Sequence, residues 1–250
     1  MQERIQKILS ARGICSRRKA EEYLLQGLVK VNGKVAKVGE KADPECDEII
    51  VDGTVLQARQ EMLYYVMNKP VGVVTENVDR SSPDRKRRSK EDVDDQSPSV
   101  RDLLPPDLRG KIFPVGRLDK ETSGLLLFTN DGVLAYRLTH PKFPHEKEYS
   151  VRVDRPIPDG PLRKLSSGMM ILGSKTKKAV VHRLSTRSFT IALSEGRNRQ
   201  IRRMCQKIGY HVTHLKRIRI VSLVDDQMKE GEVRMLTVEE KNALIKAIDL

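Results

Sequence analysis

The segment from residue 112 to residue 132 constrains the fold of this chain more than any other stretch. The run from Ile112 to Leu118 is apolar enough for a buried strand, and Leu125 to Thr129 predicts a second strand. The loop between them contains the carboxylate of Asp119 and ends at Ser123-Gly124. A charged loop held between two core strands has little freedom, which suits a catalytic group. The alternative is a hairpin loop with an ordinary solvated aspartate.

Composition limits the partners and the compartment of the chain. A length of 250 residues allows one medium domain and a small one, and a net charge of +13 favours a polyanion such as nucleic acid over a membrane surface. No apolar run approaches the roughly 20 residues of a spanning helix, and the N-terminus lacks the apolar core of a signal peptide. Cys15, Cys46 and Cys205 are too far apart for a disulfide framework or a zinc site. We therefore expect a cytoplasmic protein.

The N-terminal part of the chain predicts a small module of two helices and a sheet. Apolar residues at helical spacing cover Ile5 to Arg12, and a second helix runs from Arg17 to Gln26. Alternating segments around Asn32-Gly33 predict a hairpin, to which Ile49 to Val51 adds a strand. The second helix begins with Arg17-Arg18-Lys19, where cations and free backbone N–H groups suit a phosphate; the alternative is a solvated basic helix face.

Two polar stretches interrupt the chain. Residues 57–61 lack periodicity, so we place a domain boundary there, between domains 1–60 and 61–250. Residues 80–99 combine a basic block and an acidic block with almost no apolar residues, which predicts a mobile insertion. The insertion is either an arm that grasps RNA or a surface loop without a target.

The second half of the chain predicts further strands and two helices. One helix starts at Asn130, strands are expected at 146–153 and 189–193, and the chain between them should form other strands with a turn at Pro158-Asp159-Gly160. The stripe of Ile201, Met204, Cys205 and Ile208 predicts a helix that Gly209 ends.

A basic run covers Glu195 to Arg219. It holds eight Arg or Lys and one acid, so it carries more than half of the net charge. A solvated helix is one interpretation, and a groove that follows phosphates is the favoured one. The histidines, including His211 and His214, have no third partner at a metal-ligand spacing, so we expect no metal.

Several motifs resemble the pseudouridine synthases. Gly116-Arg117-Leu118-Asp119-x-x-Thr122-Ser123-Gly124 resembles their catalytic motif, and Thr129-Asn130-Asp131-Gly132 is similar to the Rsu branch, which modifies ribosomal RNA. Lys147-x-Tyr149 resembles the second family motif, and the segment from Glu195 to Cys205 resembles the third. Residues 2–50 resemble the small RNA-binding module first named from ribosomal protein S-four.

The resemblance implies an α+β protein: a small N-terminal α/β RNA-binding module, and a larger catalytic domain with a mixed, mostly antiparallel sheet flanked by helices. It implies isomerisation of a flipped-out uridine without a cofactor. Asp119 would act on the sugar as a nucleophile or a base, Tyr149 would lie against the base, and Arg202 would pair with Asp119. The implied substrate and RNA contacts are Arg117, Lys147, Leu215, Arg197, Arg199, Arg203, Arg4, Arg12, Arg17, Arg18 and Lys19.

The expected partner is ribosomal RNA, naked or in an assembly intermediate, with the large subunit favoured and the chain acting as a monomer. Two other functions stay open. One is a non-catalytic RNA-binding or ribosome-assembly protein with the same fold. The other is a carboxylate-based glycosidase, for which the motif offers Asp119 and Glu121.

Overall fold

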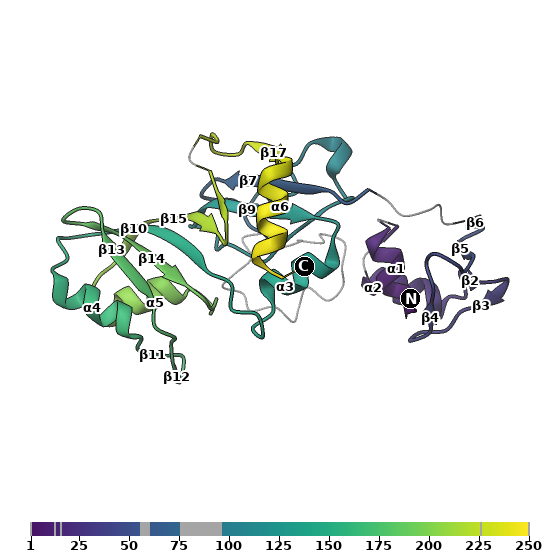
Figure 1. The fold of residues 1–250 in the computed structure, drawn as a ribbon, viewed down its shortest axis with the longest axis horizontal. Coiled ribbons are helices and arrows are strands. Elements are labelled where there is room, and N and C mark those ends of the chain that lie inside the picture. Colours follow the sequence, from purple (N-terminus) through teal and green to yellow (C-terminus); the bar gives the residue numbers. More distant parts are fainter. Residues whose placement is uncertain are drawn as a thin grey trace. The chain divides into compact units, whose positions relative to one another are not determined.

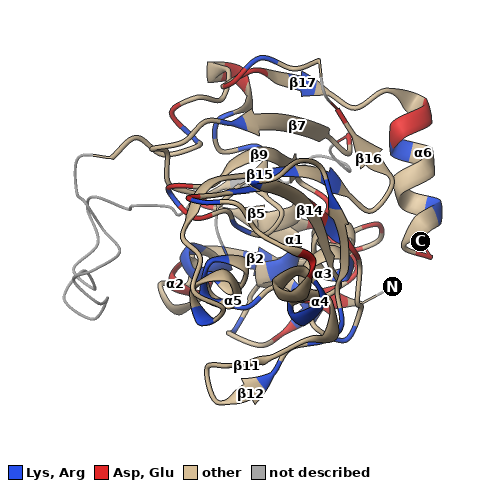
Figure 2. Ribbon diagram, turned by 90° about the vertical axis from the view of Figure 1, so that its left-hand side faces the viewer, with Lys and Arg blue, Asp and Glu red and all other residues tan. Residues whose placement is uncertain are grey.

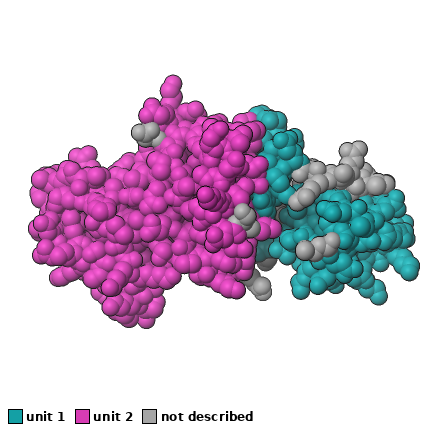
Figure 3. Space-filling model, viewed as in Figure 1, with its two compact units in different colours: residues 1–63, 106–113, 129–132 teal, residues 64–105, 114–128, 133–250 magenta. Residues whose placement is uncertain are grey.

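The computed structural model describes residues 2–12, 14–15, 17–55, 61–75, 97–225 and 227–249. The chain divides into two compact units (Figure 3): unit 1 comprises residues 1–63, 106–113 and 129–132, and unit 2 comprises 64–105, 114–128 and 133–250. The predicted domain boundary at 57–61 and the predicted insertion at 80–99 lie mostly outside the described residues, which exclude 57–60 and 80–96. No helix in the described part of the chain is long and apolar enough to cross a membrane.

The N-terminal part of unit 1 contains two helices, α1 (Ile5–Ala11) and α2 (Arg17–Leu25). Its sheet has the order β3-β2-β5-β6. The strands are β2 (Val29–Val31), β3 (Lys34–Val35), β5 (Ile49–Val51) and β6 (Thr54–Val55), and β1 (Glu3–Arg4) pairs with β4 (Lys41–Ala42). The predicted hairpin is confirmed: Asn32 and Gly33 have φ angles of 49° and 78°, the positive values that a two-residue turn of this kind requires. Unit 1 also includes the 3₁₀-helix η2 (Pro106–Leu108).

A mixed nine-stranded sheet runs through the described part of unit 2 (Figure 1), in the order β13-β14-β10-β15-β9-β7-β17. Its strands are β13 (Val180–Arg183), β14 (Ser188–Leu193), β10 (Lys147–Val153), β15 (Val212–Ile220), β9 (Ser123–Thr129), β7 (Tyr64–Lys69) and β17 (Val233–Met235). At its sides, β16 (Leu223–Val224) pairs with β15, and β8 (Phe113–Pro114) pairs with β9. Strand β15 runs antiparallel to β10 and parallel to β9. The predicted mixed sheet is confirmed.

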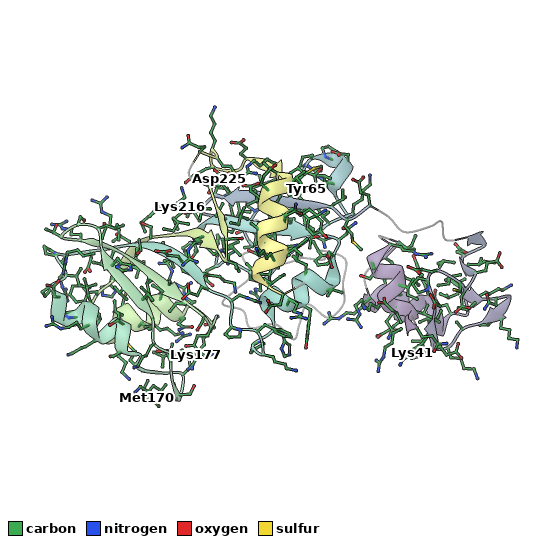
Figure 4. The ribbon with its side chains drawn as sticks, viewed as in Figure 1. Lys41, Tyr65, Met170, Lys177, Lys216 and Asp225 are labelled. Atoms are coloured by element: carbon green, nitrogen blue, oxygen red, sulfur yellow. The ribbon has the colours of Figure 1, made fainter. Side chains whose placement is uncertain are left out.

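Four helices flank this sheet within the described residues: α3 (Gly132–Thr139), α4 (Asp159–Ser167), α5 (Gln200–Lys207) and α6 (Val238–Ala247). Apolar residues of α4 and α5 pack with those of β10 and β14 in one core cluster. The short hairpin of β11 (Met170–Ile171) and β12 (Ser174–Lys175), which carries Met170, projects below the sheet in Figure 4. Helix α6 begins with a capping box at Thr237 and has acids in its first turn and lysines further along (Figure 2).

Two local predictions are wrong. The segment from Pro158 to Gly160 starts α4 instead of forming a turn, because a proline is tolerated ahead of the first helical turn and an aspartate is favourable in it. The strand predicted for residues 112–118 is limited to Phe113–Pro114. Gly116 has a φ of 78°, a left-handed conformation that ends the extended run before the acidic loop.

Candidate active site

The loop from Leu118 to Thr122 is fixed through every one of its carbonyl groups. The donors, in the order of these carbonyls along the chain, are Thr75 Oγ1 (2.8 Å), Thr122 N (3.0 Å), Gly72 N (2.8 Å), Arg202 Nη2 (2.8 Å) and Lys69 Nζ (2.8 Å). Groups of the 69–75 segment and of Arg202, together with one backbone N–H of the loop itself, therefore hold the five residues that include Asp119. Such a loop presents its carboxylate in a fixed position.

Two buried side chains support the loop, one from the last residue of β7 and one from the segment that follows it. Thr75 is 5% exposed, and its hydroxyl also accepts a hydrogen bond from Leu118 N at 3.1 Å. Lys69 is 0% exposed, and its ammonium also donates to Pro70 O at 2.9 Å. Burial lowers the pKa of Lys69 to about 8, while the nearby Asp119 acts in the opposite direction. Neither residue was predicted from the sequence as part of the site.

Gly124 brings the end of this loop against β15. Its φ is 105°, and it pairs with Arg217 where β9 and β15 run parallel. A Cβ atom at this position would lie 2.6 Å from Arg217 N and closer still to the Arg217 carbonyl oxygen. Only glycine permits this approach, so the Ser-Gly pair of the motif sets the distance between the loop and β15.

A cleft of about 670 Å³ in unit 2 opens over this loop. Its lining includes Asp119, Lys147, Tyr149, Leu215 and Arg217. Asp119 is half-buried, and within the described residues no group donates a hydrogen bond to its carboxylate or forms an ion pair with it. The carboxylate is therefore available to a molecule bound in the cleft.

Lys147 and Tyr149 lie two residues apart on β10, so both side chains project from the same face of the sheet. Lys147 Nζ donates to Leu138 O at 3.2 Å and His145 O at 3.4 Å. Burial, and next to it the charge of Arg217, lower the pKa of Lys147 to about 8. Tyr149 is half-buried and packs against the core cluster of α4 and α5.

Arg217 is a buried cation of the cleft that sequence reasoning missed. It is 2% exposed, its Nε donates to Leu125 O at 2.7 Å, and its Nη2 has no hydrogen-bond partner among the residues that the structure describes. The sequence predicts Leu215 as a substrate contact, and Leu215 lines the cleft. Since side chains two apart in a strand share a face, the position of Arg217 relative to Leu215 was the available signal.

Arg202 lies against the acidic loop but not on the carboxylate of Asp119. Its Nη2 bonds to the carbonyl of Glu121 and its Nη1 to Val212 O at 3.3 Å, and the structure contains no ion pair between Arg202 and Asp119. Glu121 instead pairs with Arg199 at 2.6 Å, which lowers the pKa of the Glu121 carboxyl against the opposing effect of burial. The predicted pairing of Arg202 with Asp119 stays a prediction.

The other predicted cations of unit 2 differ in the hydrogen bonds that they make within the protein. The Arg197 guanidinium donates to Ser174, to Lys175 O and to Glu195, and so ties the β11–β12 hairpin to the cleft wall. Arg203 donates to Asn198 O and Oδ1 at 3.1 and 3.0 Å. Arg117 is exposed and lines the cleft.

The predicted cations of unit 1 gather at the ends of its two helices. Arg17, Arg18 and Lys19 are exposed at the start of α2, where Lys19 forms an ion pair with Glu22 at 2.7 Å. Arg4 is exposed just before α1, and the guanidinium of Arg12 donates to Pro44 O. No group of three or more His, Cys, Asp or Glu in the described residues could hold a metal ion.

Comparisons with known proteins match this geometry. The family model for RNA pseudouridylate synthase matches residues 63–207, and that for the S4 domain matches residues 3–49. The chain belongs to the RNA pseudouridylate synthase family. It is 38% identical to the dual-specificity RNA pseudouridine synthase RluF of Escherichia coli K12, over 98% of this chain and 79% of that protein.

Two further relatives cover almost the whole chain. The ribosomal large subunit pseudouridine synthase B of Bacillus subtilis is 39% identical over 97% of this chain and 95% of its own length. A solved pseudouridylate synthase structure is 31% identical with a TM-score of 0.67, over 96% of this chain and 99% of that one. The prediction of a pseudouridine synthase with an N-terminal RNA-binding domain is confirmed.

Proposed function

We propose that this enzyme converts one or more uridines of ribosomal RNA to pseudouridine, with Asp119 as the residue that acts on the sugar. The observation that carries the proposal is the Asp119 carboxylate itself. It lines the cleft, accepts no hydrogen bond from any of the described residues, and stands on a loop whose five carbonyls are all bonded. A fixed, unpartnered carboxylate beside a cleft of nucleotide size is what glycosidic-bond chemistry needs.

The reaction breaks the bond between C1′ and N1 and forms a bond between C1′ and C5 of the same base. The proton leaves C5 for solvent and N1 gains one, so atoms and electrons balance within one nucleotide. A carboxylate can serve as the nucleophile or the base at the sugar, while the cleft must keep the detached base in place as it turns. No cofactor is needed for this isomerisation.

Lys147 and Arg217 are suited to hold the detached base. When the C1′–N1 bond breaks, N1 of uracil keeps the electron pair, so negative charge spreads over the base and its carbonyl oxygens. The free Nη2 of Arg217 and the ammonium of Lys147 are cations in the same cleft as Asp119. Partly buried cations act on such a charge much more strongly than solvated ones. Tyr149, two residues from Lys147 on β10, would lie against the ring of the base.

Arg202 is proposed as a positioning residue. Its bond to Glu121 O holds the loop, and movement of the guanidinium toward Asp119 on RNA binding would form the predicted ion pair. Arg117, Leu215, Arg197, Arg199 and Arg203 are proposed to contact the substrate at the cleft. Arg4, Arg12, Arg17, Arg18 and Lys19 are proposed to contact the RNA backbone from the N-terminal domain.

The roles of the two domains and the ribosomal subunit are proposed from the comparisons with related proteins. We assign residues 1–60 to RNA binding and 61–250 to catalysis, in line with the two family matches. The name of the Bacillus subtilis relative favours the large ribosomal subunit. We also propose that the enzyme acts as a monomer, and that it works in the cytoplasm because its proposed substrate is ribosomal RNA.

Tritium release from C5 of labelled uridine tests the proposal. Large-subunit rRNA transcripts and ribosomal assembly particles are incubated with the wild type, Asp119→Asn and Glu121→Gln. We expect release by the wild type, none by the Asn variant and near-normal release by the Gln variant, because the Glu121 carboxylate is already engaged by Arg199. Equal release by wild type and Asp119→Asn would refute the role of Asp119.

The same reactions separate the other two functions. A wild type inactive on both transcripts and particles, with RNA binding retained, would indicate a non-catalytic RNA-binding protein. Free uracil among the products would indicate a glycosidase, and equal losses in Asp119→Asn and Glu121→Gln would support a pair of catalytic carboxylates.

A further inference from the structure

Three rings gather on the surface at the end of α3. The centroids of Tyr136 and His140 lie 4.6 Å apart, and Phe143 lies 5.9 Å from Tyr136 and 6.3 Å from His140. We call Tyr136, His140 and Phe143 the aromatic platform. Tyr136 is 51% exposed, His140 is exposed and Phe143 is half-exposed. The rings thus contact each other and leave much of their area to solvent.

The position of the platform is unusual for this chain, in which only 4% of residues are aromatic. Phe128, Phe189 and Tyr210 of the same unit are, by contrast, buried in the protein interior. Exposure of three adjacent rings leaves apolar area in water without any gain in folding. A cluster of this kind points to a ligand with a flat apolar face.

Two cations accompany the rings. The Arg137 guanidinium lies 4.8 Å from the centre of Phe143, and Lys142 Nζ lies 6.0 Å from it. Arg137 is also bonded to Ile248 O at 3.4 Å. Rings that bind bases together with cations that bind phosphates form the usual surface for single-stranded nucleic acid.

The platform is held in place by its own backbone. His140 N donates to Tyr136 O at 2.9 Å, Phe143 N donates to His140 O at 3.0 Å, and Lys142 N donates to His140 Nδ1 at 3.2 Å. The backbone that carries the three rings, and the ring of His140, are therefore already held before RNA binds. Preorganisation of this kind lowers the entropic cost of binding.

The platform is continuous with the cleft that contains Asp119. His140 and Phe143 both belong to the cleft lining, as does Thr139, the last residue of α3. The methyl group of Thr139 lies 3.5 Å from where a Cβ would stand at Gly116, in the catalytic motif. A strand whose uridine enters the cleft therefore passes close to the platform.

We propose that the aromatic platform binds an unpaired nucleobase next to the target uridine by stacking, with Arg137 and Lys142 on the adjoining phosphates. This deepens the proposed function by naming the part of the substrate that this face of the site recognises. A flipped uridine leaves its stack at a cost of a few kcal/mol, and stacking of the neighbouring base on the rings offsets part of that cost. The proposal requires an RNA partner that is single-stranded beside its target.

Fluorescence of 2-aminopurine tests the platform. The probe is a short single-stranded oligouridylate with one 2-aminopurine, titrated with full-length protein. Stacking on a side-chain ring quenches the fluorophore. We expect Tyr136→Leu to weaken binding about tenfold, which corresponds to about 1.4 kcal/mol and lies within the range for one stacked base. Tyr136→Phe keeps the ring and should bind as the wild type does.

Val133→Ala is the matched control. Val133 is on the same helix and is 47% exposed, and it is neither a ring nor part of the cleft lining. We expect it to bind the probe as the wild type does. Thermal unfolding of each variant checks the fold. Equal affinity of Tyr136→Leu and wild type, or an equal loss in Val133→Ala, would overturn the platform.

The probe also separates this proposal from the proposed function. The Asp119→Asn variant should quench the fluorescence of the probe as the wild type does, although it releases no tritium from rRNA. An active wild type together with unchanged binding by Tyr136→Leu would refute the platform alone. Loss of probe binding by Tyr136→Leu in a protein without isomerase activity would refute the reaction and leave the platform as an RNA site.

Discussion

Replacement of Thr75 by valine is the sharpest test of how the acidic loop is held. The Thr75 hydroxyl donates to Leu118 O at 2.8 Å and accepts from Leu118 N at 3.1 Å, so one oxygen satisfies both backbone groups of the residue before Asp119. Leu118 and Thr75 are both buried. Valine has nearly the shape of threonine but neither donates nor accepts.

The magnitude follows from the two groups that lose their partner. A buried N–H or C=O left unsatisfied costs about 1–3 kcal/mol. Two such groups would cost about 2–6 kcal/mol, and the added apolar contact of the new methyl group offsets about 1 kcal/mol. We therefore expect Thr75→Val to destabilise the catalytic domain by about 3 kcal/mol. Thr75→Ser keeps the hydroxyl and should lose only about 1 kcal/mol for the missing methyl group.

Urea unfolding followed by circular dichroism measures the stability, since the chain has no tryptophan. Hydrogen exchange of peptides that contain Leu118 assigns the effect to the loop, because the Leu118 amide loses its acceptor. We expect kcat for uridine isomerisation to fall in Thr75→Val and to stay near normal in Thr75→Ser, since a displaced carboxylate reacts slowly.

Two results would refute this reasoning. Substitutions at ordinary surface positions change the unfolding free energy by up to about 0.5 kcal/mol. If Thr75→Val differs from the wild type by no more than that, the N–H and C=O of Leu118 must find other partners. Equal damage in Thr75→Val and Thr75→Ser would mean that the methyl group, and not the hydroxyl, supports the loop.

Two further predictions concern the same region. Gly124→Ala and Gly116→Ala share the cost of a side chain at positive φ, about 1–2 kcal/mol, but only the first brings a Cβ into the backbone of Arg217. We expect Gly124→Ala to lower the melting temperature much more, and equal effects would contradict the close approach. Burial lowers the pKa of Lys69 from 10.5 to about 8, so between these values the unfolded chain holds a proton that the folded one has lost, and stability rises with pH. Keeping the Lys69 ammonium charged in the folded protein costs about 3 kcal/mol, at about 1.4 kcal/mol per pKa unit. This cost is fully present below pH 8, and Lys69→Met removes it. The unfolding free energy of the wild type relative to Lys69→Met should therefore rise by about 3 kcal/mol from pH 8 to pH 10.5, and a constant difference in urea unfolding would show that Lys69 titrates normally.

The local elements were predictable where one short-range effect decides them. The hairpin at Asn32-Gly33 forms because those two residues accept positive φ, and α5 forms because its apolar stripe repeats at helical spacing. The start of α4 was misread because Pro158-Asp159-Gly160 is compatible with a turn and with a helix start. Burial of Leu162 and Leu165 against the sheet decides between these, and burial depends on the rest of the fold.

The sequence by itself determined the family, the acidic loop with Asp119, and the strand segments that contain Tyr149 and Leu215. These features rest on contiguous motifs and on the alternation of a strand, which need no tertiary information. Only the tertiary structure decided that Lys69, Thr75 and Arg202 all bond to the loop, that the free Nη2 of Arg217 is buried at the cleft, and that the rings at the end of α3 stay exposed. Burial and hydrogen-bond partners come from segments far apart in the chain, so no local pattern of residues contains them.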